Sequence, residues 1–105
     1  MIIVTGSVTA REDSFDALRE ASLAHVHRSR LEDGCLLHSV QIDCEDPLRL
    51  FFYEQWRDMA ALQAHFVQPG SHELLRAIRE LAASSEPITI LDASELAVQA
   101  FLPQA

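Results

Sequence analysis

The stretch LRLFFYEQWRDMAALQAHF, residues 48–66, decides the predicted fold. Its first ten residues, 48–57, combine aromatic and aliphatic side chains in a pattern that is typical of a β-strand. Side chains alternate along a strand, so Phe52, Glu54 and Trp56 share one face. If Trp56 points into the core, then Glu54 does too. A buried carboxylate loses its solvation unless it is paired or protonated, so this strand predicts a partner for Glu54.

The remaining elements follow from periodicity and capping residues on either side of this strand. Asp58 caps a helix that ends at about residue 67, and QPGS at 68–71 interrupts the helical pattern. Gly34 suits the left-handed position that ends the first helix. The sequence predicts strands at 2–10, 35–43, 48–57 and 87–93 and helices at 14–30, 58–67 and 71–84, with Asp13 or Ser14 capping the first helix and Ser71 the third.

The order of these elements is β-α-β-β-α-α-β, which is the split β-α-β plan of ferredoxin-like domains with the second helix broken in two. The predicted fold class is therefore α+β, a single domain over residues 1–105 with a four-stranded antiparallel sheet. Helices cover one sheet face. The other face carries Ile3, Leu37, Phe51 and Tyr53. A second subunit laid face to face would cover these apolar side chains, so we expect a homodimer.

Composition and charge narrow the classes of partner. Of 105 residues, 16 are Asp or Glu and 8 are Lys or Arg, a net charge of −8 that opposes binding to nucleic acid or to an anionic membrane. No uninterrupted apolar segment approaches the ~20 residues that span a bilayer. Cys35 and Cys44 lie nine residues apart at opposite ends of one predicted strand, where they do not easily form a disulfide. We therefore expect reduced thiols and a cytoplasmic protein.

The first predicted helix places polar side chains on its core-facing side. With about 100° between successive residues, one stripe combines Phe15, Leu18 and Val26 with Ser22, His25 and Ser29. Buried polar groups need hydrogen-bond partners. For Ser22 and Ser29, bonding back to helix carbonyls is the simpler alternative to lining a cavity that holds a polar ligand. An imidazole cannot be satisfied in this way, so His25 is a candidate binding residue.

Glu54 and the histidines form the candidate catalytic group. His38 and His25 are the side chains expected to pair with Glu54. A Glu–His pair in a cleft is a common arrangement for proton transfer near neutral pH. The sequence leaves open the alternative in which Glu54 reaches the rim or accepts from a backbone amide. His65 borders the apolar stripe of its helix, so it can face either a cleft or solvent.

Spacing along the chain predicts no metal site and no cofactor motif. His25 and His27 diverge by about 200° around a helix, and no Cys/His group has the spacing of metal ligands. Three scattered glycines form no loop that cradles a phosphate, and no nucleophile elbow is present.

Nearly the whole chain resembles the antibiotic biosynthesis monooxygenase (ABM) family. The residues that carry the resemblance are RLEDGCLLHSVQIDCEDPLRLFFYEQWRDMAALQAHFVQPGSHELL: an acid-x-Gly-Cys-Leu segment, an aromatic-Glu-x-Trp strand, and a helix ending in His before a break that contains Pro. The resemblance implies a dimer of ferredoxin-like subunits whose sheets form a shared α+β barrel. It also implies oxidation of quinols or anthrone-type polyphenols by molecular oxygen without metal or flavin.

The resemblance extends to single residues. Glu54, Trp56 and His65 match the strand–helix motif, whereas His38 stands where many relatives place a tyrosine. Haem-degrading relatives carry an asparagine on the first strand, where this chain has Gly6, so haem degradation is not expected.

The predicted activity is cofactor-independent oxidation of a small electron-rich aromatic compound with molecular oxygen. The predicted catalytic residues are His38, Glu54 and His65, and the predicted substrate-binding residues are Trp56, His25, Phe52 and Ser22. In this mechanism His38 or His65 is the base, Glu54 orients it, and Trp56 is a flat wall against the aromatic ring. Two alternatives remain: an isomerase or lyase that acts on a small carbonyl compound, and a dimeric domain that binds a ligand without turning it over.

Overall fold

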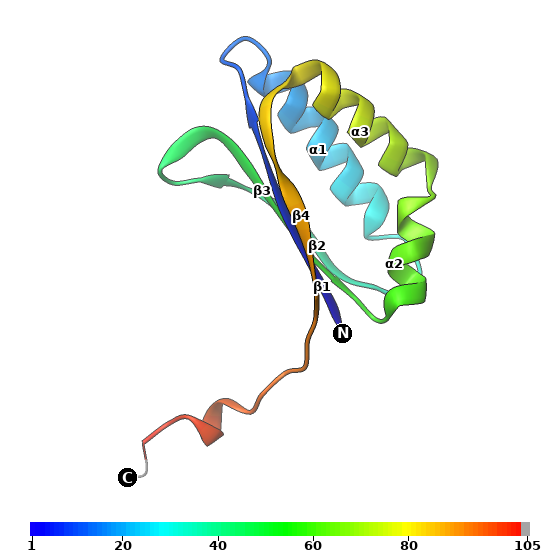
Figure 1. Ribbon diagram of the computed structural model, residues 1–105, viewed down its shortest axis with the longest axis vertical. Helices are drawn as coiled ribbons and strands as arrows, with labels where there is room; N and C mark the ends of the chain where they lie inside the picture. Colours follow the sequence, from blue (N-terminus) through cyan, green and yellow to red (C-terminus); the bar gives the residue numbers. More distant parts are fainter. Residues whose placement is uncertain (104–105) are drawn as a thin grey trace.

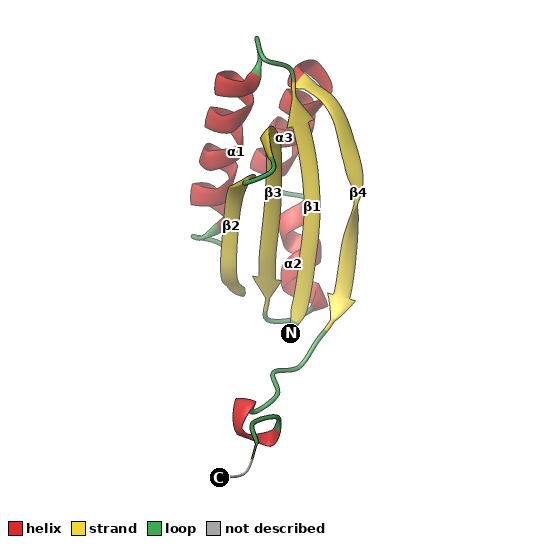
Figure 2. Cartoon of the chain, turned by 90° about the vertical axis from the view of Figure 1, so that its left-hand side faces the viewer, coloured by secondary structure: helices red, strands yellow, loops and turns green. Residues whose placement is uncertain are grey.

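The computed structural model describes residues 1–103 and shows an α+β fold in which helices pack on one face of an antiparallel sheet (Figures 1 and 2). The sheet order is β2-β3-β1-β4, with antiparallel pairing throughout. In this part of the chain the elements are β1 (Ile2–Ala10), α1 (Phe15–Ser29), β2 (Cys35–Asp43), β3 (Asp46–Trp56), α2 (Met59–Phe66), α3 (Pro69–Leu81), β4 (Ala82–Asp92) and the 3₁₀ turn η1 (Val98–Ala100). The predicted fold class and element order are confirmed.

Three predicted boundaries differ in the structure: both ends of α3 and the start of β4. Strand β4 begins at Ala82, five residues earlier than predicted, because Ala82 pairs with Ala10 as soon as α3 ends. The segment between Ala82 and Pro87 therefore extends β4 and does not prolong the helix. Helix α3 begins at Pro69, where the first helical turn needs no N–H donor and the fixed proline φ angle already suits a helix.

The predicted residues occupy the N-cap position at two of the three helices, α1 and α2, but only one of them makes a side-chain capping bond. Asp58 caps α2, since its side chain accepts from the Ala61 backbone N–H at 2.9 Å. Ser14 precedes α1, but its hydroxyl donates to the Leu81 carbonyl at 2.6 Å and so joins the start of α1 to the end of α3. Ser71 lies inside α3, and its hydroxyl donates to the His65 carbonyl at 2.7 Å. The two predicted serine caps thus connect helices to one another.

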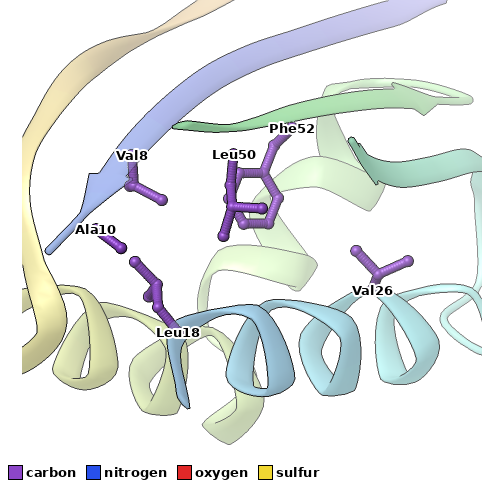
Figure 3. Packing of buried hydrophobic residues seen from close by; sticks show 6 residues of the cluster. All are labelled: Val8, Ala10, Leu18, Val26, Leu50 and Phe52. Carbon is purple, nitrogen blue, oxygen red and sulfur yellow. The ribbon is translucent and has the colours of Figure 1, made fainter. Parts of the chain in front are cut away.

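Two apolar clusters fill the space between sheet and helices. The first, shown in Figure 3, consists of Val8, Ala10, Leu18, Val26, Leu50 and Phe52. The second consists of Ile2, Val4, Trp56, Ala61 and Leu62. On β3, Glu54 lies between Phe52 of the first cluster and Trp56 of the second. Strand alternation therefore places a carboxylate between two apolar clusters.

The other sheet face and the C-terminal segment remain uncovered. Leu37 is exposed, and Ile3, Phe51 and Tyr53 are half-buried, on the face that no helix covers (Figure 2). Beyond β4 the chain extends away from the body (Figure 1), with exposed Leu96, Val98, Phe101 and Leu102. Across residues 1–103, no helix has the length and apolar character needed to cross a membrane.

Candidate functional site

Glu54 points beneath the helices, as the alternation of β3 predicts. Only 8% of the residue is exposed, and Oε1 accepts a hydrogen bond from the Trp56 indole N–H at 2.8 Å. The two side chains are two residues apart on one strand face, so this buried bond is local to β3. The side chain of Glu54 therefore does not reach the rim. Within residues 1–103 it accepts its hydrogen bond from Trp56 and not from a backbone amide.

His38 comes to Glu54 from the neighbouring strand. The two residues are directly opposed in the β2–β3 register, and His38 Nε2 lies 3.3 Å from Glu54 Oε1. The distance suits an ion pair, but the ring is not aligned for a hydrogen bond. Neither ring nitrogen of His38 has a hydrogen-bond partner within the described chain, although the residue is only 1% exposed.

His65 reaches the same carboxylate from α2. Its Nε2 lies 3.9 Å from Glu54 Oε1, while its Nδ1 lies 3.0 and 3.2 Å from the two oxygens of Glu32. An ionised carboxylate only accepts, so the Glu32 contact places the proton on Nδ1 and leaves the lone pair on Nε2. The Ser71 hydroxyl holds the His65 carbonyl, and the side chain is buried. His65 therefore faces the interior.

His25 completes the group from α1. Its ring centroid lies 5.2 Å from that of His38 and 5.1 Å from that of His65. Its Nδ1 is buried and has no hydrogen-bond partner in residues 1–103. Burial, and then the adjacent His38 and His65 rings, lower the pKa of His25 to about 4, so the ring is neutral at pH 7.

Opposing influences set the ionisation of Glu54. Burial is the largest and raises its pKa, whereas the adjacent His38 ring and the Trp56 N–H favour the charged form. The net result is that the pKa of Glu54 lies below its usual value. The buried group is therefore a carboxylate surrounded by imidazoles, and it stabilises positive charge on any of them.

A cavity of about 510 Å³ opens beside this group, between the sheet and α3. Its polar lining includes His25, Glu54 and His65. Its apolar lining includes Val8, Phe52, Phe66, Leu74, Leu75, Ile78 and Ile88. Such a volume suits a small organic ligand, and the mixture of apolar walls with a few converging polar groups is typical of a binding site.

Three predicted site residues lie outside the cavity lining. Trp56 and Ser22 are fully buried, and His38 lies behind Glu54 on β2. The prediction gave Trp56 a flat contact with substrate; the structure gives it a hydrogen bond to Glu54. The Ser22 hydroxyl has no partner in the described residues, whereas the Ser29 hydroxyl donates to the His25 carbonyl at 2.7 Å, as the helix-bonding alternative predicts.

The sequence of residues 1–77 matches the family described as Antibiotic biosynthesis monooxygenase. The chain belongs to the ABM family.

This ABM protein is also similar to proteins of solved structure and to a protein known by its sequence. A Deinococcus radiodurans protein, provisionally named an antibiotic biosynthesis monooxygenase, is 28% identical with a TM-score of 0.87, over 92% of this chain and 96% of that one. A Pseudomonas aeruginosa protein is 29% identical with a TM-score of 0.80, over 90% and 94% of the two chains. An uncharacterised Synechocystis protein is 31% identical over 94 residues, and the match spans 90% of this chain and 64% of that protein.

Sequence reasoning missed Glu32 and the α3 wall of this ABM site. Glu32 lies between α1 and β2, where it reads as part of a helix-ending turn, and its contact with His65 spans 33 residues. No local pattern signals such a contact. The α3 side chains Leu74 and Ile78 form a recognisable apolar stripe, but that stripe alone does not show whether it fills a core or borders a cavity.

The arrangement offers two kinds of chemistry. Glu32, His65 and Glu54 form a series of proton-handling groups that ends at the cavity, which suits general base catalysis. In addition, His25, His38 and His65 each present a ring nitrogen within 4.8 Å of the others, so the three side chains are candidate metal ligands.

Proposed function

We propose that this protein oxidises a small electron-rich aromatic compound, such as a quinol, anthrone or polyphenol, with molecular oxygen after base-assisted deprotonation and without a cofactor. One observation carries the proposal: His65, held by Glu32, lines an apolar cavity with its free Nε2 beside Glu54. Membership of the ABM family supports the oxygenase class.

His65 is the proposed base. It lines the cavity, whereas His38 does not. With the proton of the resting ring on Nδ1, Nε2 can accept a phenolic or benzylic proton from a bound substrate. Glu32 at 3.0 Å and Glu54 at 3.9 Å then stabilise the imidazolium that forms. In this scheme Trp56 is a positioning residue, because its N–H fixes the Glu54 carboxylate.

Deprotonation opens the substrate to oxygen. Ground-state oxygen is a triplet, so the substrate anion first transfers one electron to give a substrate radical and superoxide. Their combination forms a carbon–oxygen bond, and the peroxide takes up the proton held by His65. Loss of water from this hydroperoxide, as a carbon–hydrogen bond breaks, leaves a carbonyl. One oxygen atom thus enters the product and the other leaves as water, while the apolar walls keep bulk water from the anion.

An oxygen electrode tests this proposal. EDTA-treated protein is supplied with anthrone or a hydroquinone, and oxygen uptake is compared with the rate without protein. His65→Asn is expected to reduce the catalysed rate by ~10²–10⁴-fold. His72→Asn is the matched control, because His72 also borders the cavity but is exposed. Equal rates for wild type and His65→Asn would refute the proposed role of His65.

A further inference from the structure

Three buried histidines from three different elements converge at one point. His25 comes from α1, His38 from β2 and His65 from α2, and one nitrogen of each lies within 4.8 Å of the others. The residues are far apart in sequence, so helical or strand spacing cannot reveal the group. All three are at least 95% buried.

Three ring nitrogens of this group lack hydrogen-bond partners in the described residues. Both ring nitrogens of His38 and Nδ1 of His25 make no hydrogen bond within residues 1–103. A buried polar atom without a hydrogen-bond partner destabilises the fold. Three such atoms in one cluster call for an explanation, and a bound ion that accepts one lone pair from each ring satisfies one nitrogen of His25 and one of His38 together.

Carboxylates complete the surroundings of the cluster. Glu32 binds Nδ1 of His65 and directs Nε2 inward, which is the carboxylate–histidine arrangement that supports metal ligands. Glu54 Oε1 lies 3.3 Å from His38 Nε2 and 3.9 Å from His65 Nε2. The two carboxylates supply the negative charge that balances a divalent cation.

We propose that His25, His38 and His65, with Glu54 as the fourth ligand, bind one divalent transition-metal ion of the zinc class. Three imidazoles and one carboxylate are a donor set that suits Zn²⁺ and Co²⁺. On a tetrahedral ion with Zn–N bonds of about 2.0–2.1 Å, the nitrogens lie ~3.4 Å apart. Binding therefore draws the rings together by side-chain rotation from their present separation of up to 4.8 Å.

In this state the ion is bound to His65 Nε2, which is the nitrogen that acts as the base in the proposed oxygenation. This inference thus rests on the same side chains as the proposed function but makes a separate claim. It assigns to the site a metal-bound state in which His65 Nε2 is unavailable to substrate.

Titration with Co²⁺ tests the site directly. Protein without a polyhistidine tag is freed of metal with EDTA, dialysed and titrated with Co²⁺, whose visible absorption reports tetrahedral coordination. We expect saturation at one equivalent and displacement of Co²⁺ by Zn²⁺. His25→Asn, His38→Asn and His65→Asn should each weaken binding by at least ten-fold. Glu32→Gln should weaken it by ~10–100-fold.

Two control variants separate loss of the metal site from the general effect of removing a histidine or a carboxylate. His27→Asn removes an exposed histidine from the same helix as His25 and should leave binding unchanged. Glu45→Gln is the corresponding control for Glu32, because Glu45 is exposed in the β2–β3 turn. If a cluster variant fails to fold, X-ray absorption of the Zn²⁺-loaded wild type replaces it and should show histidine scattering with three or more N/O ligands.

The outcomes separate this inference from the proposed function. No saturable binding, a spectrum without tetrahedral bands, or equal loss of binding in His27→Asn would overturn the metal site. Metal binding is measured without substrate and oxygen uptake in EDTA, so either proposal can fail alone. If both hold, one equivalent of Zn²⁺ suppresses oxygen uptake at least ten-fold and EDTA restores it.

Discussion

Glu54 contributes both the packing of its side chain and a negative charge to the interior, and a substitution can remove the charge while keeping the packing. Glu54→Gln keeps the shape of the side chain but removes the charge that would stabilise an imidazolium. We expect oxygen uptake to fall by ~10²-fold or more. Glu86→Gln is the control, because Glu86 borders the same cavity but forms its ion pair with Arg49. Equal activity of Glu54→Gln and wild type would contradict the assigned role.

His25 gives the folded protein a defined sensitivity to acid. Its folded pKa of about 4 lies below the ordinary 6.5, so the unfolded chain binds a proton first as the pH falls. The contribution of neutral His25 to the free energy of unfolding is fully present above pH 6.5. It is lost as the pH falls toward 4, and the full loss is on the order of 3 kcal/mol. Urea denaturation in EDTA at pH 7 and pH 4.5 measures it. His25→Asn should reduce the pH dependence, while His27→Asn retains it.

His25 packs against the rings of His38 and His65. Both variants retain these two rings, so they differ in which helix α1 histidine is lost. An unchanged pH dependence in His25→Asn would show that its ring is not the group that resists protonation.

The turn between α1 and β2 is an element-scale constraint on the site. Gly34 has a φ angle of +85°, and a Cβ atom there would lie 2.5 Å from the Ala61 Cβ at the start of α2. Gly34→Ala should therefore destabilise the fold by about 2 kcal/mol or more, through backbone strain and displacement of α2.

Gly70 provides a matched comparison for Gly34. A Cβ there would approach the Arg28 side chain, which is flexible and half exposed, and Gly70 has no positive φ angle. Gly70→Ala should change the unfolding free energy by less than about 1 kcal/mol. Urea denaturation of both variants decides the point, and similar losses for the two would contradict the proposed constraint.

Predictability from sequence differed between elements for physical reasons. The type of element was predictable for β3 and α1, because a strand alternation and a helical stripe are local patterns. The early start of β4 was not, because its Ser-rich first residues have no apolar alternation and are held by pairing with β1. Glu54 was predictable as inward-facing from Trp56, but the Glu32–His65 contact depends on how α2 meets the preceding loop.

At the scale of the whole molecule, the uncovered sheet face supports a proposed homodimer. Phe51 and Tyr53 lie half-buried on that face, where a second copy would cover them. Light scattering should give twice the 11.7 kDa mass of one chain. Phe51→Lys should yield monomer, because it would bury a charge in the interface. Leu31→Lys is the control, since Leu31 is 88% exposed and lies beyond the end of α1. A wild-type monomer at micromolar concentration would contradict this assembly.

The central claim is that the buried base removes a proton from substrate, and anaerobic hydrogen exchange measures that step alone. Anthrone in deuterated buffer, without oxygen and with EDTA, exchanges its benzylic hydrogens at a rate that NMR follows. Wild-type protein should accelerate exchange at least ten-fold over buffer, and His65→Asn should not, while His72→Asn should match wild type. Equal exchange with wild type and His65→Asn, or no acceleration by either, would contradict the account.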